Sequence, residues 1–286
     1  MKIARYWKRA DIRIDSKDGR PMDVVAWGWS ADTPDEAQKK ADEAVQRSAR
    51  RIASGEGFPD SYGYPDRPAR EEIIEEIKDE SGETIAMITR NSYGSLVLNT
   101  SRLMFIDIDV PKPASQGLIG LIKSLFGSSP SDPFESALIR IREKAATLPD
   151  LTFRVYRTAA GFRLAVINKR IDPTGSESQS LLSAFGSDPL YVRLCKNQES
   201  FRARLTPKHW RCRVESPRGR YPFRDQVEED MHRLWIENYN AATAGYAVCR
   251  FVEQIGSQPT FSDFRRLIEL HDRETKATSS TDALLA

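Results

Sequence analysis

The segment Phe105–Val110 constrains the fold of this chain more than any other part of the sequence. It reads Phe-Ile-Asp-Ile-Asp-Val, so apolar residues surround Asp107 and Asp109. Residues two apart in a strand point to the same face, which places the two carboxylates together. The apolar neighbours indicate a buried strand, where paired carboxylates cost free energy unless cations compensate them. Paired aspartates suit Mg²⁺ or Mn²⁺; the alternative is a structural turn motif before Pro111.

Strands and helices alternate around this segment, which indicates a mixed α+β protein. Strands are predicted over residues 71–79, 84–91, 95–100, 103–110, 151–157 and 163–168, and helices over residues 133–148, 176–185 and 193–201. The apolar segment 117–126 fits either a core helix or a flexible hydrophobic excursion, and the sequence leaves both open.

A β-hairpin followed by a helix is predicted at the N-terminus. The predicted elements are strands over residues 2–14 and 23–30, a helix to about residue 52 and a loop over residues 56–70. An Asp-Gly turn between the strands is a strong hairpin signal. Thr33, Pro34 and Glu36 give the pattern of a helix N-cap followed by a capping box.

The C-terminal part is predicted to be helical. Apolar residues at helical spacing indicate a long helix from residue 226 to about residue 253, and a last helix is predicted over residues 261–275. His232 and His271 are assigned to helix surfaces. The chain is therefore divided into an N-terminal module (1–70), a core (71–224), C-terminal helices (225–275) and a disordered tail (276–286).

A second motif follows the aspartates. One strand ends at Arg157, the small-residue turn Thr158–Gly161 follows, and a second strand begins near Arg163. Small residues let a phosphate or base approach the backbone, and the two arginines offer fixed positive charge to a triphosphate. The alternative is a β-hairpin turn with surface arginines.

A third motif contains Asp188 and, a few residues later, Arg193. Asp188 is a candidate third metal ligand. The alternative is a helix N-cap, because Pro189 follows it directly.

The order of these motifs resembles the catalytic core of the archaeo-eukaryotic primase superfamily, which includes the primase-polymerases, over residues 84–195. In that family a hydrophobic-hydrophobic-Asp-hydrophobic-Asp strand precedes a small-residue turn with a histidine, and an acidic residue follows later. Here Arg163 replaces the histidine; arginine binds phosphate but cannot act as a neutral acid or base.

The resemblance implies an RRM-like antiparallel sheet core with helices packed on one face. The N-terminal hairpin-helix module and the C-terminal helices, which have no counterpart in the resemblance, flank this core. It implies catalytic Asp107, Asp109 and Asp188, with Mg²⁺ or Mn²⁺ on the first two. It also implies that a nucleoside triphosphate contacts Arg157, Thr158, Gly161, Arg163 and Arg193.

The stretch from residue 189 to residue 224 is rich in arginine and lysine, with aromatic residues between them. Basic groups beside stacking aromatics are typical of single-stranded nucleic-acid grooves. The candidate nucleic-acid contacts are Arg202, Arg204, Lys208, Trp210, Arg211 and Arg213. The alternative is a solvated surface neutralised by the acidic residues at 225–230.

Three function classes follow. The first is a primase-polymerase-like, metal-dependent nucleotidyltransferase or nucleotide-binding protein acting on single-stranded or primed nucleic acid. The second is a catalytically inactive nucleic-acid-binding protein on the same fold, such as a replication or mobile-element factor. The third is a structural or interaction protein without a metal site. No apolar run approaches the length of a membrane span, and three widely spaced cysteines fit a reducing cytoplasm.

Overall fold

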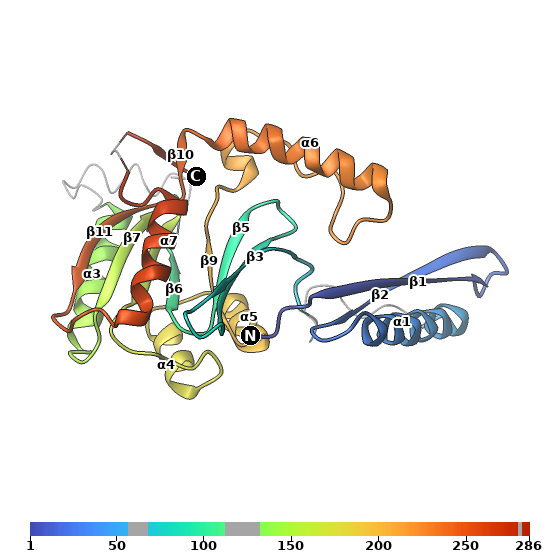
Figure 1. Cartoon of the computed structure of the whole chain (residues 1–286), viewed down its shortest axis with the longest axis horizontal. Helices are drawn as coiled ribbons and strands as arrows, with labels where there is room; N and C mark the ends of the chain where they lie inside the picture. Colours follow the sequence, from blue (N-terminus) through green and yellow to red (C-terminus); the bar gives the residue numbers. More distant parts are fainter. Residues whose placement is uncertain (57–67, 112–131, 280–281) are drawn as a thin grey trace, which may run out of the picture.

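The structure is a computed structural model that describes residues 1–56, 68–111, 132–279 and 282–286. The fold is α+β, as the sequence predicts, with several small antiparallel sheets and an N-terminal β-hairpin packed on a helix (Figure 1). The apolar segment 117–126 and most of the loop predicted over residues 56–70 lie outside the described residues. Among the helices of the described part, none is long and apolar enough to cross a membrane.

The central sheet has the strand order β11-β7-β8-β6, and every neighbouring pair is antiparallel. Its strands are β6 (Met104–Asp109), β7 (Phe153–Thr158), β8 (Gly161–Val166) and β11 (Cys249–Ile255). Helix α3 (Pro133–Ala146) joins β6 to β7, and β8 lies between these two strands. This is a split β-α-β unit, the arrangement expected of an RRM-like core.

A second sheet has the order β3-β4-β5-β9 and lies beside β6. Its strands are β3 (Glu72–Lys78), β4 (Thr84–Arg90), β5 (Leu96–Thr100) and β9 (Phe201–Arg204). The hydroxyl of Tyr191 joins the two sheets, because it lies 3.1 Å from the Phe105 carbonyl of β6 and 3.0 Å from the Arg202 carbonyl of β9. Tyr191 belongs to α5 (Pro189–Gln198), which follows α4 (Ser176–Ala184).

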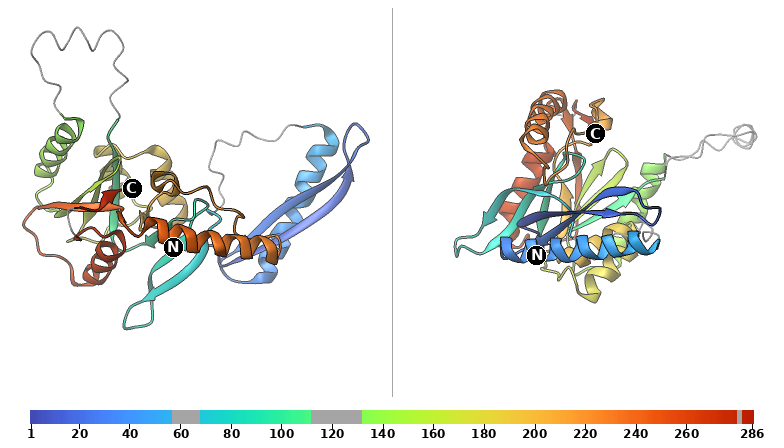
Figure 2. Two further views of the ribbon diagram at one scale, coloured as in Figure 1. Left: turned by 90° about the horizontal axis from the view of Figure 1, so that it is seen from above. Right: turned by 90° about the vertical axis from the view of Figure 1, so that its right-hand side faces the viewer.

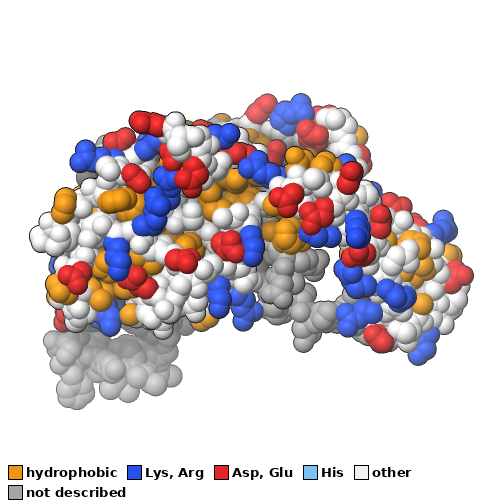
Figure 3. Space-filling view, turned by 60° about the horizontal axis from the view of Figure 1, so that its bottom comes forward, with side chains coloured by type: hydrophobic (Ala, Val, Ile, Leu, Met, Phe, Trp, Pro, Cys, Tyr) orange, Lys and Arg blue, Asp and Glu red, His pale blue; other side chains and the backbone are white. Residues whose placement is uncertain are grey.

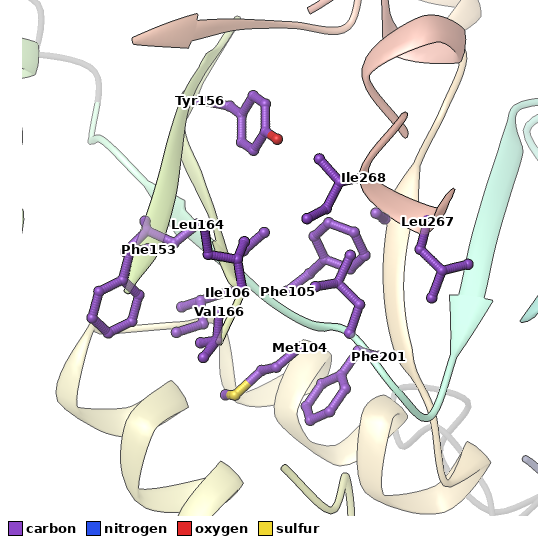
Figure 4. Close-up of a cluster of buried hydrophobic side chains, with 14 of the residues drawn as sticks. Met104, Phe105, Ile106, Phe153, Tyr156, Leu164, Val166, Phe201, Leu267 and Ile268 are labelled. Atoms are coloured by element: carbon purple, nitrogen blue, oxygen red, sulfur yellow. The ribbon is translucent and has the colours of Figure 1, made fainter. Parts of the chain in front are cut away.

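Helices cover both faces of the central sheet rather than one. Phe162 of β8 packs on Phe134 of α3, with 6.2 Å between ring centroids. On the other face, Phe105 packs at 5.2 Å on His271 of α7 (Arg265–Thr275). Figure 1 shows α3 and α7 on opposite sides of β7, and Figure 4 shows Phe105 beside Ile268 of α7. Helix α7 therefore covers part of the face that carries Asp107.

The N-terminal module has the predicted form. Strands β1 (Tyr6–Asp15) and β2 (Pro21–Ser30) pair along their whole length, and α1 (Pro34–Ser54) packs across one face of the hairpin (Figure 2). The Thr33 hydroxyl accepts a hydrogen bond from the Glu36 amide at 3.2 Å, which confirms the N-cap.

The C-terminal part differs from the prediction. Helix α6 (Gln226–Thr243) stops ten residues before the expected position, and the chain continues as β10 (Tyr246–Ala247) and β11. Gly245 follows the helix, and the β-branched and aromatic residues of β11 pair with β7. The last helix is confirmed as α7, after the short 3₁₀ helix η2 (Ser262–Phe264).

The tail was predicted to be disordered, and in its described residues this is wrong. Strand β12 (Leu284–Leu285) pairs in parallel with β10, and the Ala286 amide donates to the Ala247 carbonyl at 2.9 Å. The Ala277 carbonyl accepts from the Phe251 amide at 2.9 Å. Backbone pairing, which composition does not reveal, orders these residues.

Candidate nucleic-acid interface

The two aspartates of β6 lie on the face of the sheet that α7 partly covers. Asp107 is directly opposite Arg163 of β8 in the register, and Asp109 is opposite Gly161. Arg163 donates two hydrogen bonds to Asp107, from Nε to Oδ1 at 2.7 Å and from Nη2 to Oδ2 at 3.1 Å. The arginine that the sequence assigns to phosphate binding is therefore occupied by the first of the two predicted metal ligands.

Arg163 is 2% exposed, and its remaining donors are also engaged. Its Nη1 donates to the Arg204 carbonyl at 2.9 Å and lies 3.4 Å from Nε2 of His271. Because a guanidinium only donates, Nε2 is the accepting nitrogen and Nδ1 of His271 donates to Asp272, 3.0 Å away. Burial lowers the pKa of Arg163, but the charge and hydrogen bonds of Asp107, with smaller effects of Cys249 and Tyr191, together raise it above its ordinary value, so the guanidinium stays charged.

His271 and Asp272 are the polar residues of this region that the sequence did not identify. His271 is 1% exposed, so its assignment to a helix surface is wrong. Burial, and then the charge of Arg163, lower the pKa of His271 although Asp272 acts in the opposite direction. The sequence could not reveal this position, because a histidine followed by an aspartate looks the same whether the two residues are buried or lie on a helix surface.

The carboxylates do not form a preassembled metal centre. Both oxygens of Asp107 accept from Arg163, whereas Asp109 is exposed. The Asp188 carboxylate accepts from the Leu190 amide at 2.8 Å and caps α5, as the alternative interpretation expected. Within the described ranges, no three His, Cys, Asp or Glu side chains are grouped to hold a metal ion. The two carboxylates that the resemblance assigns to Mg²⁺ or Mn²⁺ therefore differ: Asp107 is paired with Arg163, with which a metal ion would have to compete, and Asp109 is exposed.

The small-residue turn between β7 and β8 is closely approached by β6. A Cβ atom on Gly161 would lie 1.9 Å from the Ile108 carbonyl oxygen, and the Val110 amide donates to the Ala160 carbonyl at 2.9 Å. The Thr158 hydroxyl accepts from the Ala160 amide at 3.4 Å. Packing between strands is thus sufficient to explain the glycine.

Arg157 and Arg163 lie on opposite faces of the sheet. The Arg157 guanidinium carbon lies 3.0 Å from the centre of the Phe134 ring, under α3. The two arginines therefore do not converge on one phosphate. Arg193 is exposed on α5.

Arg202, a predicted nucleic-acid contact, is part of the core. It is 7% exposed and donates to Glu71 at 2.6 Å, Asn99 at 2.6 Å and Gln198 at 2.5 Å. This network ties β9 to β5 and to the residue before β3, so it gives Arg202 a structural role, and the structure does not place this predicted nucleic-acid contact on the surface.

The next cations form a cluster around the aspartates, which we call the cationic cluster: Arg204, Lys208 and Arg211. Burial, followed by the charges of Arg163 and Arg211, lowers the pKa of Arg204 to about 10. Burial and the charges of Arg204 and Arg211 lower the pKa of Lys208, and Asp109 and Asp107 raise it. Asp109 also raises the pKa of Arg211, against a larger lowering by burial. Asp107 and Asp109 thus offset only part of the effect of burial and of the repulsion between the cations.

Aromatic side chains border the cationic cluster. Trp210, on the short 3₁₀ helix η1 (His209–Cys212), is 47% exposed and lies under Lys208, whose Nζ is 5.2 Å from the ring. Tyr93, which is 53% exposed, meets Trp210 edge to face with 5.3 Å between centroids. Arg213 caps η1 and points to solvent. Exposed rings beside cations are the elements of a stacking surface for bases.

Net charge alone does not mark an interface on this protein. The face drawn in Figure 3 carries Lys and Arg side chains interspersed with Asp and Glu over most of its area. The protein has a net charge of only +2. Local geometry, and not overall charge, therefore distinguishes the cationic cluster.

Comparison with known proteins gives no relative: no family model, no curated protein and no solved structure matches this chain.

Proposed function

We propose that this protein binds single-stranded or primed nucleic acid through phosphate contacts at the cationic cluster, with bases stacked on Trp210 and Tyr93. The observation that carries the proposal is the grouping of the partly buried Arg204, Lys208 and Arg211 beside the exposed rings of Trp210 and Tyr93. The charges of Arg204 and Arg211 also lower the pKa of Lys208. A polyanion stabilises positive charges that are held close together at a partly buried site. Its binding also releases counterions from the nucleic acid, which favours the complex.

The resemblance to the primase superfamily supports the same assignment. Strand β6 carries the paired aspartates, and the β7–β8 hairpin carries the second motif beside it. The pairing of Asp107 with Arg163 favours the form of the hypothesis in which nucleic acid binds without catalysis. In this form Asp107 holds Arg163, and through it the Arg204 backbone, in place.

The test is fluorescence anisotropy of a labelled single-stranded oligonucleotide over a range of salt concentrations, in the presence of EDTA. We expect the slope of log affinity against log salt to fall by about 1.4 in Lys208→Gln/Arg211→Gln, because each single-strand phosphate contact contributes roughly 0.7. We expect Trp210→Ala to weaken binding about tenfold, and Trp210→Phe to restore most of the loss.

A matched control is Arg140→Gln/Arg142→Gln, which removes two charges from α3 on the opposite face of the sheet. It should leave the salt slope unchanged. Equal effects of the two double variants would mean that binding follows net charge only, and the interface would be misplaced.

A second candidate is the metal-dependent nucleotidyltransferase. It is favoured by the shared face of Asp107 and Asp109 and by the 40% exposure that the Asp107 side chain retains beside Arg163. The test is thermal unfolding with Mn²⁺ and a nucleoside triphosphate, alone and together. Stabilisation that needs both ligands and is lost in Asp109→Ala would support this candidate; an unchanged melting temperature at saturating ligand would exclude it.

A further inference from the structure

A separate small pocket lies where the end of β4 meets the N-terminal half of α6. It is lined by the following residues: Arg70, Glu72, Arg90, Asn91, Ser92, Gly219, Arg220, Tyr221 and His232. Arg70, Ser92 and Arg220 are exposed, and the other lining residues are partly or fully buried. None of these residues belongs to the interface proposed above.

Two buried polar atoms in this pocket have no hydrogen-bond partner in the described part of the chain. They are Nε of Arg90 and Nδ1 of His232. The Arg218 backbone also acts on the His232 ring and raises its pKa, against a larger lowering by burial. His232 is 6% exposed, which makes the sequence assignment of this residue to a helix surface wrong as well. Buried polar atoms of native proteins nearly always have partners, so two orphans lining one pocket indicate a polar group that fills it.

The charges of the pocket favour an anion. Arg90 and Arg220 contribute positive charge, and the guanidinium of Arg70, which also lines the pocket, lies against Trp7 and Trp27. Against them stands Glu72, the one carboxylate among the lining residues that the structure describes. Burial is the main cause that raises the pKa of Glu72; the charge of Arg90 lowers it and that of Glu229 raises it. The raised pKa reduces the ability of Glu72 to neutralise the arginines.

The size of the pocket limits how such an anion can enter. The space in this pocket that is accessible to water-sized groups is about 10 Å³, enough for about one such group. One oxygen of a tetrahedral oxyanion fits this space, and the other oxygens must stay at the mouth. There the exposed side chains of Ser92 and Arg220 offer donors.

We infer that this pocket binds a phosphate group, with one oxygen between Arg90 Nε and His232 Nδ1 and the others facing Arg220 and Ser92. The proton in the contact with His232 comes either from the imidazole or from a P–O–H group. The site is independent of the proposed function, because inorganic phosphate, a mononucleotide or a nucleic-acid strand can each supply the group.

The experiment uses the three histidines of the full chain as separate reporters. His232 lies in the pocket, His209 touches Trp210 at the proposed interface with 4.9 Å between rings, and His271 lies behind Arg163. Sodium phosphate is titrated against sodium chloride of equal ionic strength while imidazole ¹H–¹⁵N correlations are recorded. We expect a saturable change at His232 with phosphate only, and none at His271.

Two arginines of one loop give the matched variants. Arg220→Ser should weaken phosphate binding about tenfold, since it removes a charge-assisted donor. Arg218→Ser, which removes another exposed charge, paired with Glu215 outside the pocket, should change it less than about twofold. Equal weakening by both variants would overturn the inference.

A single-stranded oligonucleotide then identifies the source of the phosphate. If it moves the His232 signal and inorganic phosphate competes, the group belongs to a strand; if only phosphate or a mononucleotide moves it, the ligand is small. A strand that moves His209 alone leaves the proposed function intact and assigns the pocket to a small ligand. No change at His232 with any of these probes would mean that the pocket holds a water molecule, and the inference would fail.

Discussion

Arg163 and Asp107 stand directly opposite each other in neighbouring strands, and the guanidinium donates to both oxygens of the carboxylate. Arg163 is fully buried, whereas 40% of the Asp107 side chain is exposed. The pair therefore connects the interior of the protein with the surface on which the cationic cluster lies.

Removal of Asp107 should destabilise the fold, because it leaves a buried guanidinium without its counter-charge. We expect Asp107→Ala to lower the free energy of unfolding by about 2–3 kcal/mol, below the full value for a buried pair because Asp107 is partly solvated. Asp109→Ala, on the same strand but exposed, should cost less than about 0.5 kcal/mol. Urea unfolding measures both; equal costs would show that the pair is not formed in solution.

Arg202 should behave as a core residue. Arg202→Ala leaves Glu71 buried without its partner, so we expect a loss of about 3–5 kcal/mol in stability. Arg213→Ala, an exposed arginine that follows η1, should be nearly neutral. If Arg202→Ala folds with normal stability but loses nucleic-acid affinity, Arg202 is a binding residue and not a structural one.

The Gly161→Ala substitution tests the close approach of β6 to the hairpin turn. The new Cβ would lie 1.9 Å from the Ile108 carbonyl, so the strands must separate at a cost of about 1–3 kcal/mol. Gly245→Ala is the control, since nothing lies within 4 Å of its Cβ position. Thermal unfolding of the two variants compares them, and similar melting temperatures would refute the packing explanation.

Stability should fall in mild acid because His271 is buried in its neutral form. Its pKa in the folded state lies below the usual value of 6.5, mainly through burial. Below pH 6.5 the unfolded chain takes up a proton that the folded chain does not, so the contribution is complete above that pH and is lost as the pH falls. His271→Gln should flatten the dependence of unfolding free energy on pH between about 7 and 5; an unchanged slope would mean that His271 titrates normally.

Residues 282–286 should be protected from exchange with solvent. The Ala286 amide donates to Ala247, and β12 pairs with β10. Hydrogen–deuterium exchange of the C-terminal peptide should therefore be slower than that of an unstructured peptide of the same sequence. Exchange at the unstructured rate would restore the original expectation of a disordered tail.

Local patterns were sufficient to predict much of the fold. Thr33 caps α1, the Asp-Gly turn joins β1 to β2, and Asp107 and Asp109 share one face of β6, since each of these features depends on near neighbours in the chain. Of the two interpretations of Asp188, metal ligand and helix N-cap, the structure shows the N-cap, which also depends only on near neighbours.

Features that depend on distant partners were not predictable. Nothing in the sequence shows that Arg163 faces Asp107 or that Arg202 reaches Glu71, because these contacts depend on the register between strands. For the same reason the basic residues 189–224 were treated as one surface. In the structure Arg202 is buried in the core, whereas Arg204 and Arg211 lie near the aspartates. Strand β11 was assigned to a helix because its pairing with β7 determines its structure.

The position of β11 also affects the order in which the molecule can form during synthesis. The N-terminal hairpin and α1 have their contacts close in sequence, so they can fold soon after they leave the ribosome. The central sheet must wait, because β7 obtains its outer neighbour only once residues 249–255 have been made. Until then the edge of β7 presents unpaired backbone groups, so a chain stalled after the basic stretch exposes an edge on which another chain can add a strand.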